Sequence, residues 1–237
     1  MWQDIALQGV ILLIAALMFS FIHNVPQSLL RKYRSYRADS NPNVLAKRHF
    51  ILGAQLLSKA RSSSPSSSSP IARSALAEAD LSISLNPRDA ASHILKSLAL
   101  DLLDGRENSV AALESLDTAL SPPAVRSLGE EERADALVKR AEIRMKLAAM
   151  MKSKGSSRKR KGKEEGLEEC VADLEESVKI MGKGSARAWR LLGECYEEKG
   201  MKDQARAAYE SAATAGDSKA AEAAHRLDGV NDGYKES

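Results

Sequence analysis

The sequence predicts an all-α fold in which an array of about four helical hairpins follows a single transmembrane helix. Three observations lead to this prediction. Between residues 44 and 217, apolar residues recur at the spacing of helix faces. Breaks that contain glycine or proline divide this region into pairs of such segments, as expected for helix–turn–helix units. The first 25 residues, in contrast, contain an uncharged apolar stretch.

The apolar stretch covers Ile5–Ile22, eighteen residues without a charged side chain. At about 1.5 Å per residue, a helix of this length spans about 27 Å, close to the hydrocarbon thickness of a bilayer. Residues 1–25 are therefore predicted to form a transmembrane signal-anchor helix that contacts the lipid bilayer through residues 5–22. The alternatives are a cleaved signal peptide and a buried core helix. A signal peptide is disfavoured because only Asp4 is charged before the stretch and no small-residue cleavage site follows it.

Residues 26–43 are predicted to be a basic juxtamembrane linker. Four cations follow the apolar stretch: Arg31, Lys32, Arg34 and Arg37. No basic side chain precedes it. The positive-inside rule then keeps the repeat domain in the cytosol. The linker either ends membrane insertion or rests on anionic headgroups. The predicted product is a single-pass membrane protein of the endoplasmic reticulum or of an organelle outer membrane, two locations that the sequence does not distinguish.

Three helical hairpins are expected between this linker and residue 181. In each, leucine or alanine recurs every three or four residues. Pro87 ends the first hairpin because proline cannot continue a helix, and Gly105 marks the turn within the second. The expected helices are 46–60 with 71–85, two helices within 90–122, and 130–150 with 167–181.

Two inserted loops are expected within these hairpins, at residues 62–70 and 152–166. The first, Ser62–Pro70, reads SSSPSSSSP and has no apolar side chain to bury. The second contains Lys152–Lys163, which reads KSKGSSRKRKGK. Repeat architectures tolerate insertions at hairpin ends, so both segments are predicted to be solvated. The basic run could instead bind RNA, acidic lipid or an acidic partner. Nucleic acid is disfavoured because the run has no aromatic residue for base stacking.

The fourth hairpin has the clearest pattern. Trp189, Leu192, Gly193 and Tyr196 fall at positions i, i+3, i+4 and i+7, which form one face of a helix. Gly193 has no side chain, so a second helix can approach closely. Gly200 is placed where a left-handed residue would end the first helix. The second helix carries small residues at the crossing and an aromatic residue on the same face: Ala205, Ala208, Tyr209 and Ala212.

This hairpin resembles the signature of a tetratricopeptide repeat (TPR). The matching residues are Trp189-x2-Leu192-Gly193-x2-Tyr196, followed by Ala205-x3-Tyr209. The resemblance implies pairs of antiparallel helices that stack on their neighbours, because one pair cannot bury its apolar face alone. It also implies a protein that binds other proteins in a concave groove and carries out no chemistry.

A short helix at residues 218–228 is predicted to cover the open end of the array. Ala220, Ala221, Ala224 and Leu227 lie in helical phase there, and a terminal repeat needs a cover with a polar outer face. Residues 229–237 contain glycine and polar residues and are expected to be a disordered tail. Cys170 and Cys195 are the only cysteines, each on a predicted helix seam or face, which agrees with a reducing compartment. Cys170 is interpreted as a small core residue. A disulfide between the two is an alternative that no pattern requires.

No pattern typical of catalysis, cofactor binding or metal binding is found. The four histidines are scattered, and phosphate-binding, dinucleotide-binding and nucleophile-elbow motifs are absent from the sequence. Adjacent acids such as Glu130–Glu132 and Glu164–Glu165 are typical of helix starts. We therefore expect no enzymatic activity, no cofactor and no metal site.

The resemblance to TPR proteins implies that the first helix of each hairpin lines the binding groove. The implied groove residues are Lys47, Phe50, Ile94, Leu98, Val138, Glu142, Arg187, Arg190 and Glu194. One subclass of the family grips the acidic end of chaperones with a clamp of lysine, asparagine and arginine. The sequence departs from that clamp because Phe50, Ala54 and Leu95 replace the expected polar residues. A segment with both apolar and charged anchors fits the lining better.

The sequence thus predicts a membrane-anchored, cytosol-facing TPR adaptor or docking protein without catalytic activity. One alternative is an accessory or assembly subunit of a membrane protein complex. A second alternative is a membrane-tethered regulator of an enzyme, with the serine-rich loop as a phosphorylation switch. The expected partners are other proteins and, through residues 5–22, the lipid bilayer.

Overall fold

A computed structural model describes residues 41–151 and 157–232 of the 237-residue chain. The chain divides into two units, residues 1–45 and 46–237, and the following account concerns the second. The predicted transmembrane helix and most of the linker lie outside the described residues, as does the end of the predicted tail. Among the helices that are described, none has the length and apolar character needed to cross a membrane.

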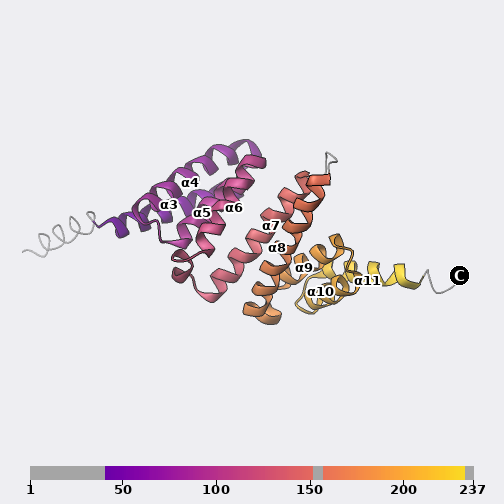
Figure 1. Cartoon of the computed structure of the whole chain (residues 1–237). Coiled ribbons are helices and arrows are strands. Elements are labelled where there is room, and N and C mark those ends of the chain that lie inside the picture. Colours follow the sequence, from indigo (N-terminus) through magenta and orange to yellow (C-terminus); the bar gives the residue numbers. More distant parts are fainter. Residues whose placement is uncertain (1–40, 152–156, 233–237) are drawn as a thin grey trace, which may run out of the picture. The chain divides into compact units, whose positions relative to one another are not determined.

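The described part of the chain is helical throughout, without strands, which confirms the predicted all-α class. Figure 1 shows successive helices running side by side as hairpins. The helices are α3 (Pro42–Ser62), α4 (Pro65–Leu85), α5 (Ala90–Leu102), α6 (Arg106–Leu120), α7 (Glu130–Met151), α8 (Ser157–Met181), α9 (Ala186–Glu198), α10 (Lys202–Thr214) and α11 (Ser218–Asp232), with short 3-10 turns at Ala124–Ser127 and Gly182–Gly184.

Each helix packs mainly on the helices before and after it in the sequence. The core between them is built largely from alanine and leucine, such as Ala75, Ala79 and Leu95 at the junction of α3, α4 and α5. Alanine at a crossing allows close approach of two helix backbones, and leucine fills the remaining space. The result is a series of neighbouring interfaces instead of one central core, as expected for stacked hairpins.

Two glycines are required by this close packing. A Cβ atom at Gly193 would lie 2.6 Å from ring atoms of Tyr209, and one at Gly53 would lie 2.8 Å from Cδ2 of Leu95. The prediction that Gly193 permits the approach of the second helix is therefore confirmed. Gly200 has a φ of +77° just after α9 ends, which also confirms the predicted left-handed turn.

The predicted loop at residues 62–70 is wrong. The structure continues α3 to Ser62 and begins α4 at Pro65, so the connection consists of Ser63 and Ser64. Proline suits the first position of a helix, where its missing N–H is not needed. The backbone N–H groups of Ser67 and Ser68 both donate to the carbonyl of Ser64, at 2.9 Å. Serine-rich composition therefore did not exclude a helix start.

The predicted boundaries of the second loop and the tail also change. Helix α8 begins at Ser157, so the part of the predicted 152–166 loop after that residue has a helical backbone. Lysine, arginine and glutamate have good helix propensity, which favours this extension. Residues 152–156 lie outside the described part. Helix α11 continues to Asp232 instead of ending near residue 228, and nothing in the structure explains this longer end.

Helix α11 packs against α10 at the end of the described hairpins. Its Ala220 and Ala224 are buried against α10, in a cluster with Ala205, Tyr209 and Ala212. Arg226 of α11 binds both carboxylate oxygens of Glu197 at 2.8 Å. Tyr209 donates to the same carboxylate at 2.9 Å, so apolar packing and polar contacts together hold the last helix in place.

Candidate protein-binding groove

A cavity of about 630 Å³ lies along the first helices of the successive hairpins. On α3 the lining residues recur at helical spacing, which places them on one face. Helices α5, α7 and α9 continue the lining. The full set is Phe50, Ala54, Leu57, Ser58, Arg61, Ala91, Ile94, Leu95, Leu98, Leu128, Glu132, Asp135, Ala136, Val138, Lys139, Ser185 and Arg187.

The floor of this groove is apolar. Leu57, Leu95 and Val138 are buried, whereas Phe50, Ile94 and Leu98 are only partly buried while they pack against the core. Apolar side chains that stay partly exposed inside a concavity leave area that a ligand can cover. The groove therefore offers a hydrophobic contact surface together with charged groups at its edges.

Five of the nine groove residues expected from the sequence line this cavity: Phe50, Ile94, Leu98, Val138 and Arg187. The other four, which are Lys47, Glu142, Arg190 and Glu194, are not part of the lining. Sequence reasoning missed Arg61, Leu128, Asp135, Lys139 and Ser185. Helical spacing from an expected residue could have found two of them. Arg61 lies eleven positions after Phe50, and Asp135 lies three before Val138.

A network of ion pairs borders the groove and connects α5, α7 and α9. Lys139 donates to Asp101 at 2.7 Å and to Glu142 at 3.3 Å. Lys146 lies 3.2 Å from Asp101, and Arg187 pairs with Glu142. Burial acts to raise the pKa of Asp101, but the hydrogen bonds and charges of Lys139 and Lys146 outweigh it, so this pKa lies below its usual value. Glu142 is thus an internal partner of two groove cations.

Arg190 has a structural partner outside the groove. Its Nε donates to Asp217 at 3.0 Å, and its guanidinium also pairs with Glu194. The other oxygen of Asp217 accepts the backbone N–H groups of Lys219 and Ala220, at 3.0 and 3.2 Å, at the start of α11. Arg190 therefore connects α9 to the covering helix, a role that its position in the sequence did not reveal.

The signature residues divide into buried and half-buried groups. Leu192, Gly193, Ala205 and Tyr209 are buried. Trp189 and Tyr196 are partly exposed: they pack against the buried clusters of the last hairpin and line a second cavity of about 560 Å³ with residues of α8 and α10. The hydroxyl of Tyr196 donates to an exposed carboxylate, Glu175, at 2.7 Å. Burial, and then this hydrogen bond, raise the pKa of Tyr196 to about 12.

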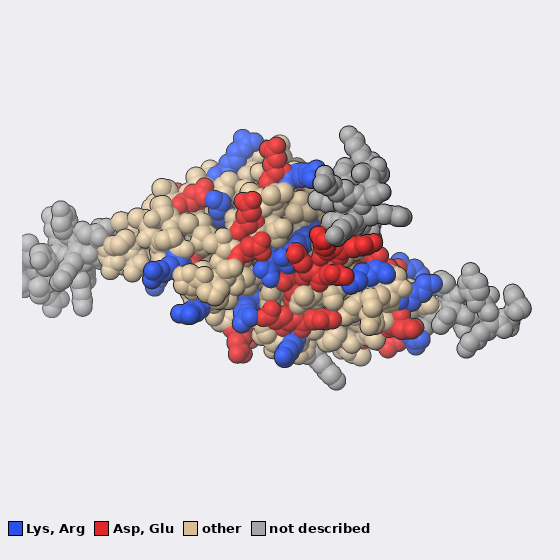
Figure 2. All heavy atoms as spheres, viewed as in Figure 1, with Lys and Arg blue, Asp and Glu red and all other residues tan. Residues whose placement is uncertain are grey.

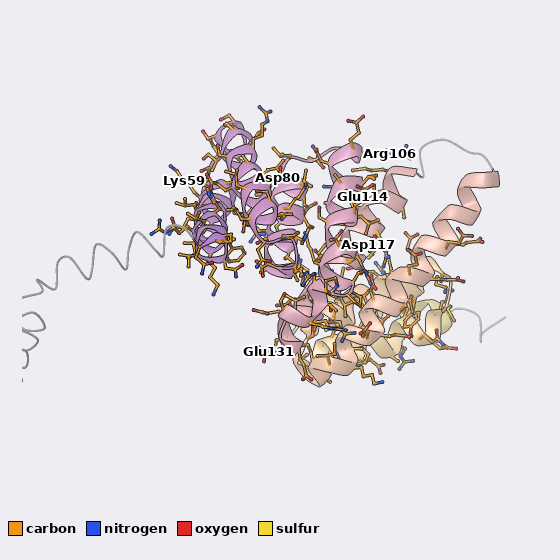
Figure 3. The ribbon with its side chains drawn as sticks, turned by 60° about the vertical axis from the view of Figure 1, so that its left-hand side comes forward. Lys59, Asp80, Arg106, Glu114, Asp117 and Glu131 are labelled. Atoms are coloured by element: carbon orange, nitrogen blue, oxygen red, sulfur yellow. The ribbon has the colours of Figure 1, made fainter. Side chains whose placement is uncertain are left out.

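A buried cluster of charges joins the second and third hairpins. Asp173 of α8 accepts two hydrogen bonds from Arg140, at 2.9 and 2.5 Å, and one from Arg144. Asp117 of α6 lies 3.0 Å from Arg140, and Glu169 lies 3.1 Å from Arg144. Figure 3 shows Asp117 on the part of α6 that faces α7 and α8. This cluster fixes three helices that position the α7 side of the groove.

An acidic surface and two cysteines lie apart from the groove. Figure 2 shows acidic side chains gathered on part of the visible face. Glu164, Glu165, Glu168 and Glu169 of α8 are exposed and lie outside the cavity lining. Both cysteines are buried and free. A hydrogen bond with the thiol of Cys170, followed by burial, raises the pKa of Cys195 and disfavours its reactive thiolate.

No protein-family model matches the chain, and no curated protein matches it. Among solved structures, the chain is similar to MamA, with 20% identity and a TM-score of 0.52 over 79% of this chain and 86% of MamA. A second structure of MamA protein aligns with 15% identity and a TM-score of 0.44, over 71% of this chain and 90% of that one. At this identity the likeness concerns the fold. The chain has a TPR-like helical repeat fold, in agreement with the signature in its fourth hairpin.

Proposed function

We propose that this protein is a non-catalytic adaptor that binds a segment of another protein in the groove lined by α3, α5, α7 and α9. The observation that supports this function most directly is the partly exposed apolar floor at Phe50, Ile94 and Leu98. Each square ångström of such surface that a partner covers contributes about 25 cal/mol. Because the lining comes from several hairpins, an elongated segment can contact more of it than a compact ligand can.

Site-specific photo-crosslinking tests this function. A photoreactive amino acid at Ala54 would lie in the cavity lining, whereas the same group at the neighbouring Gln55 would lie on an exposed position outside it. In cells that express the full chain, the probe at position 54 should form a discrete crosslinked product that the probe at position 55 does not form.

A matched pair of substitutions controls for general hydrophobicity. Leu98→Gln removes an apolar side chain from the groove, and Leu52→Gln removes one that is 48% exposed and outside the lining. The crosslink at position 54 should disappear with Leu98→Gln and persist with Leu52→Gln. Equal crosslinking from positions 54 and 55, unaffected by Leu98→Gln, would show that the groove is not the binding site.

We further propose that residues 5–22 anchor this adaptor in a membrane, with the repeat domain in the cytosol. The support is the uncharged stretch and the basic flank that follows it. Protease added to intact organelles should remove an epitope placed at Ser237. Protection of that epitope, together with loss of the first residues by cleavage, would instead indicate a lumenal or secreted product.

The crosslinked partners also distinguish the kinds of adaptor. A diverse set of partners at position 54 would indicate a docking protein. One partner recovered in a fixed ratio with the chain would indicate an accessory or assembly subunit of a membrane complex. A single enzyme whose activity changes when the chain is removed would indicate a tethered regulator.

A further inference from the structure

The charges that line the groove are not equally available to a ligand. Lys139 is already paired with Asp101 and Glu142, and Arg187 is paired with Glu142. These cations are largely compensated by neighbouring carboxylates. A ligand that paired with one of them would compete with an existing ion pair, so they contribute little to selecting its charge.

Three lining charges differ from these. Arg61 of α3 and Asp135 of α7 have no ion-pair partner within residues 41–151 and 157–232. Glu132, one turn before Asp135, uses one oxygen to accept the backbone N–H of Gly129 at 3.0 Å, in an exposed contact at the start of α7. Among the described residues, the groove therefore presents one cation without an ion-pair partner on α3 and a pair of available carboxylates on α7.

These charges lie on the two helices that flank α5. Helix α5 contacts α3 where Gly53 meets Leu95, and it is connected to α7 through the pair of Asp101 with Lys139. Its apolar lining residues, Ile94 and Leu98 among them, therefore belong to the middle of the groove. Positive charge borders this apolar region on the α3 side, and negative charge borders it on the α7 side.

We propose that the ligand of this groove is a bipolar peptide segment: apolar side chains flanked by a basic residue at one end and an acidic residue at the other. The basic residue pairs with Asp135 and Glu132, and the acidic residue pairs with Arg61. This proposal rests on the proposed adaptor function and specifies its partner. A uniformly acidic segment would place like charges against α7, and a uniformly basic segment would place one against Arg61, so both are selected against.

Selection of peptides from a random displayed library on the full chain tests the proposal. Peptides that bind the groove are those lost when the same library is selected on Leu98→Gln. Their shared pattern should be apolar residues with lysine or arginine at one end and aspartate or glutamate at the other. A shared pattern of acidic residues alone, or of apolar residues without charge, would overturn the proposal while leaving the groove as a binding site.

The best peptide then allows each contact to be assigned by double-mutant cycles. Asp135→Asn should weaken binding of the original peptide about threefold to fivefold, the range of partly exposed ion pairs, and should have little effect once the peptide's basic residue is replaced by glutamine. Arg61→Gln should behave in the same way toward the acidic residue. A measurable coupling energy between Asp135 and the peptide's acidic residue would contradict the proposal. So would the absence of any coupling energy at both Asp135 and Arg61.

Matched controls come from the same two helices. Glu131 and Lys59, both labelled in Figure 3, are exposed, lie four and two positions before Asp135 and Arg61, and are not part of the cavity lining. Glu131→Gln and Lys59→Gln should leave binding unchanged, which separates a specific contact from a general change in charge. If no peptide is lost on Leu98→Gln, the adaptor function itself fails, and the bipolar ligand fails with it.

Discussion

Asp173→Asn should destabilise the protein by about 3 kcal/mol, because it leaves two part-buried arginines without their main, buried partner. The Asp173 side chain is only 6% exposed, and those of Arg140 and Arg144 are 17% and 13% exposed. The substitution keeps the shape of the side chain but removes the negative charge that three hydrogen bonds use. Breaking a buried ion pair in this way usually costs about 3–5 kcal/mol.

The value should lie at the lower end of that range because two other carboxylates remain. Asp117 still lies 3.0 Å from Arg140, and Glu169 still lies 3.1 Å from Arg144. These contacts compensate part of the lost charge but come from more exposed side chains, at 47% and 61%. Glu169→Gln is therefore a suitable control, with an expected loss below about 0.5 kcal/mol.

Urea unfolding of the full chain, followed by helical circular dichroism, measures both losses. Hydrogen exchange of α7 and α8 then locates the effect, because a repeat array can open locally. A loss below about 1 kcal/mol for Asp173→Asn would refute the reasoning. Replacing Arg140, Arg144 and Asp173 together by leucine or methionine should recover much of the stability, since the cost comes from unpaired charge and not from lost volume.

Three other predictions concern close packing and ionisation. Gly193→Ala should destabilise the fourth hairpin by about 1–3 kcal/mol in urea unfolding, because its Cβ would meet the Tyr209 ring, whereas Gly184→Ala, with nothing within 4 Å, should be close to neutral; equal effects would contradict the packing. Spectrophotometric titration should show a phenol with a pKa of about 12 that is missing in Tyr196→Phe. Its contribution to stability should be complete below pH 10 and fall as the pH rises toward 12. Because the pKa of Asp101 is lowered in the fold, its contribution is present above its usual value of 3.8 and is lost as the pH falls below it. Asp101→Asn should therefore reduce the acid sensitivity of unfolding, and an unchanged acid transition would count against the network.

Local patterns in the sequence were sufficient to predict most of the helical hairpins. The positions of Gly193 and Tyr209 in the sequence are explained by a close crossing of two helices. The structure contains that crossing, with the Tyr209 ring packed against Gly193. The resemblance to the tetratricopeptide repeat implied Phe50, Ile94 and Leu98 as groove residues, and all three line the cavity. Gly193 and Tyr209 are 16 positions apart within one hairpin, so the crossing of α9 and α10 is local enough in sequence for residue spacing to reveal it.

Features that depend on distant partners could not be predicted in this way. Arg190 lies on a helix expected to face the groove, but its partner Asp217 is 27 positions away and belongs to another helix. The half-exposure of Trp189 depends on how α8 and α10 leave a cavity beside it. The start of α4 at Pro65 was missed for a different reason: composition indicated disorder, while the position of one proline allowed a helix to begin.

The ion pairs beside the groove have a mechanical consequence. Apolar interfaces in this array join each helix mainly to its neighbours in sequence, whereas Asp101, Lys139, Glu142 and Arg187 connect α5 to α7 and α7 to α9. These ion pairs join helices that are not adjacent in sequence, on the side of the array that carries the groove. They should therefore restrain the movement of one hairpin relative to the next. Because salt screens exposed ion pairs more than part-buried ones, the pair of the exposed Arg187 with Glu142 should weaken with ionic strength before the part-buried pair of Lys139 with Asp101. Rising salt should therefore loosen the connection of α7 to α9 while the connection of α5 to α7 is kept.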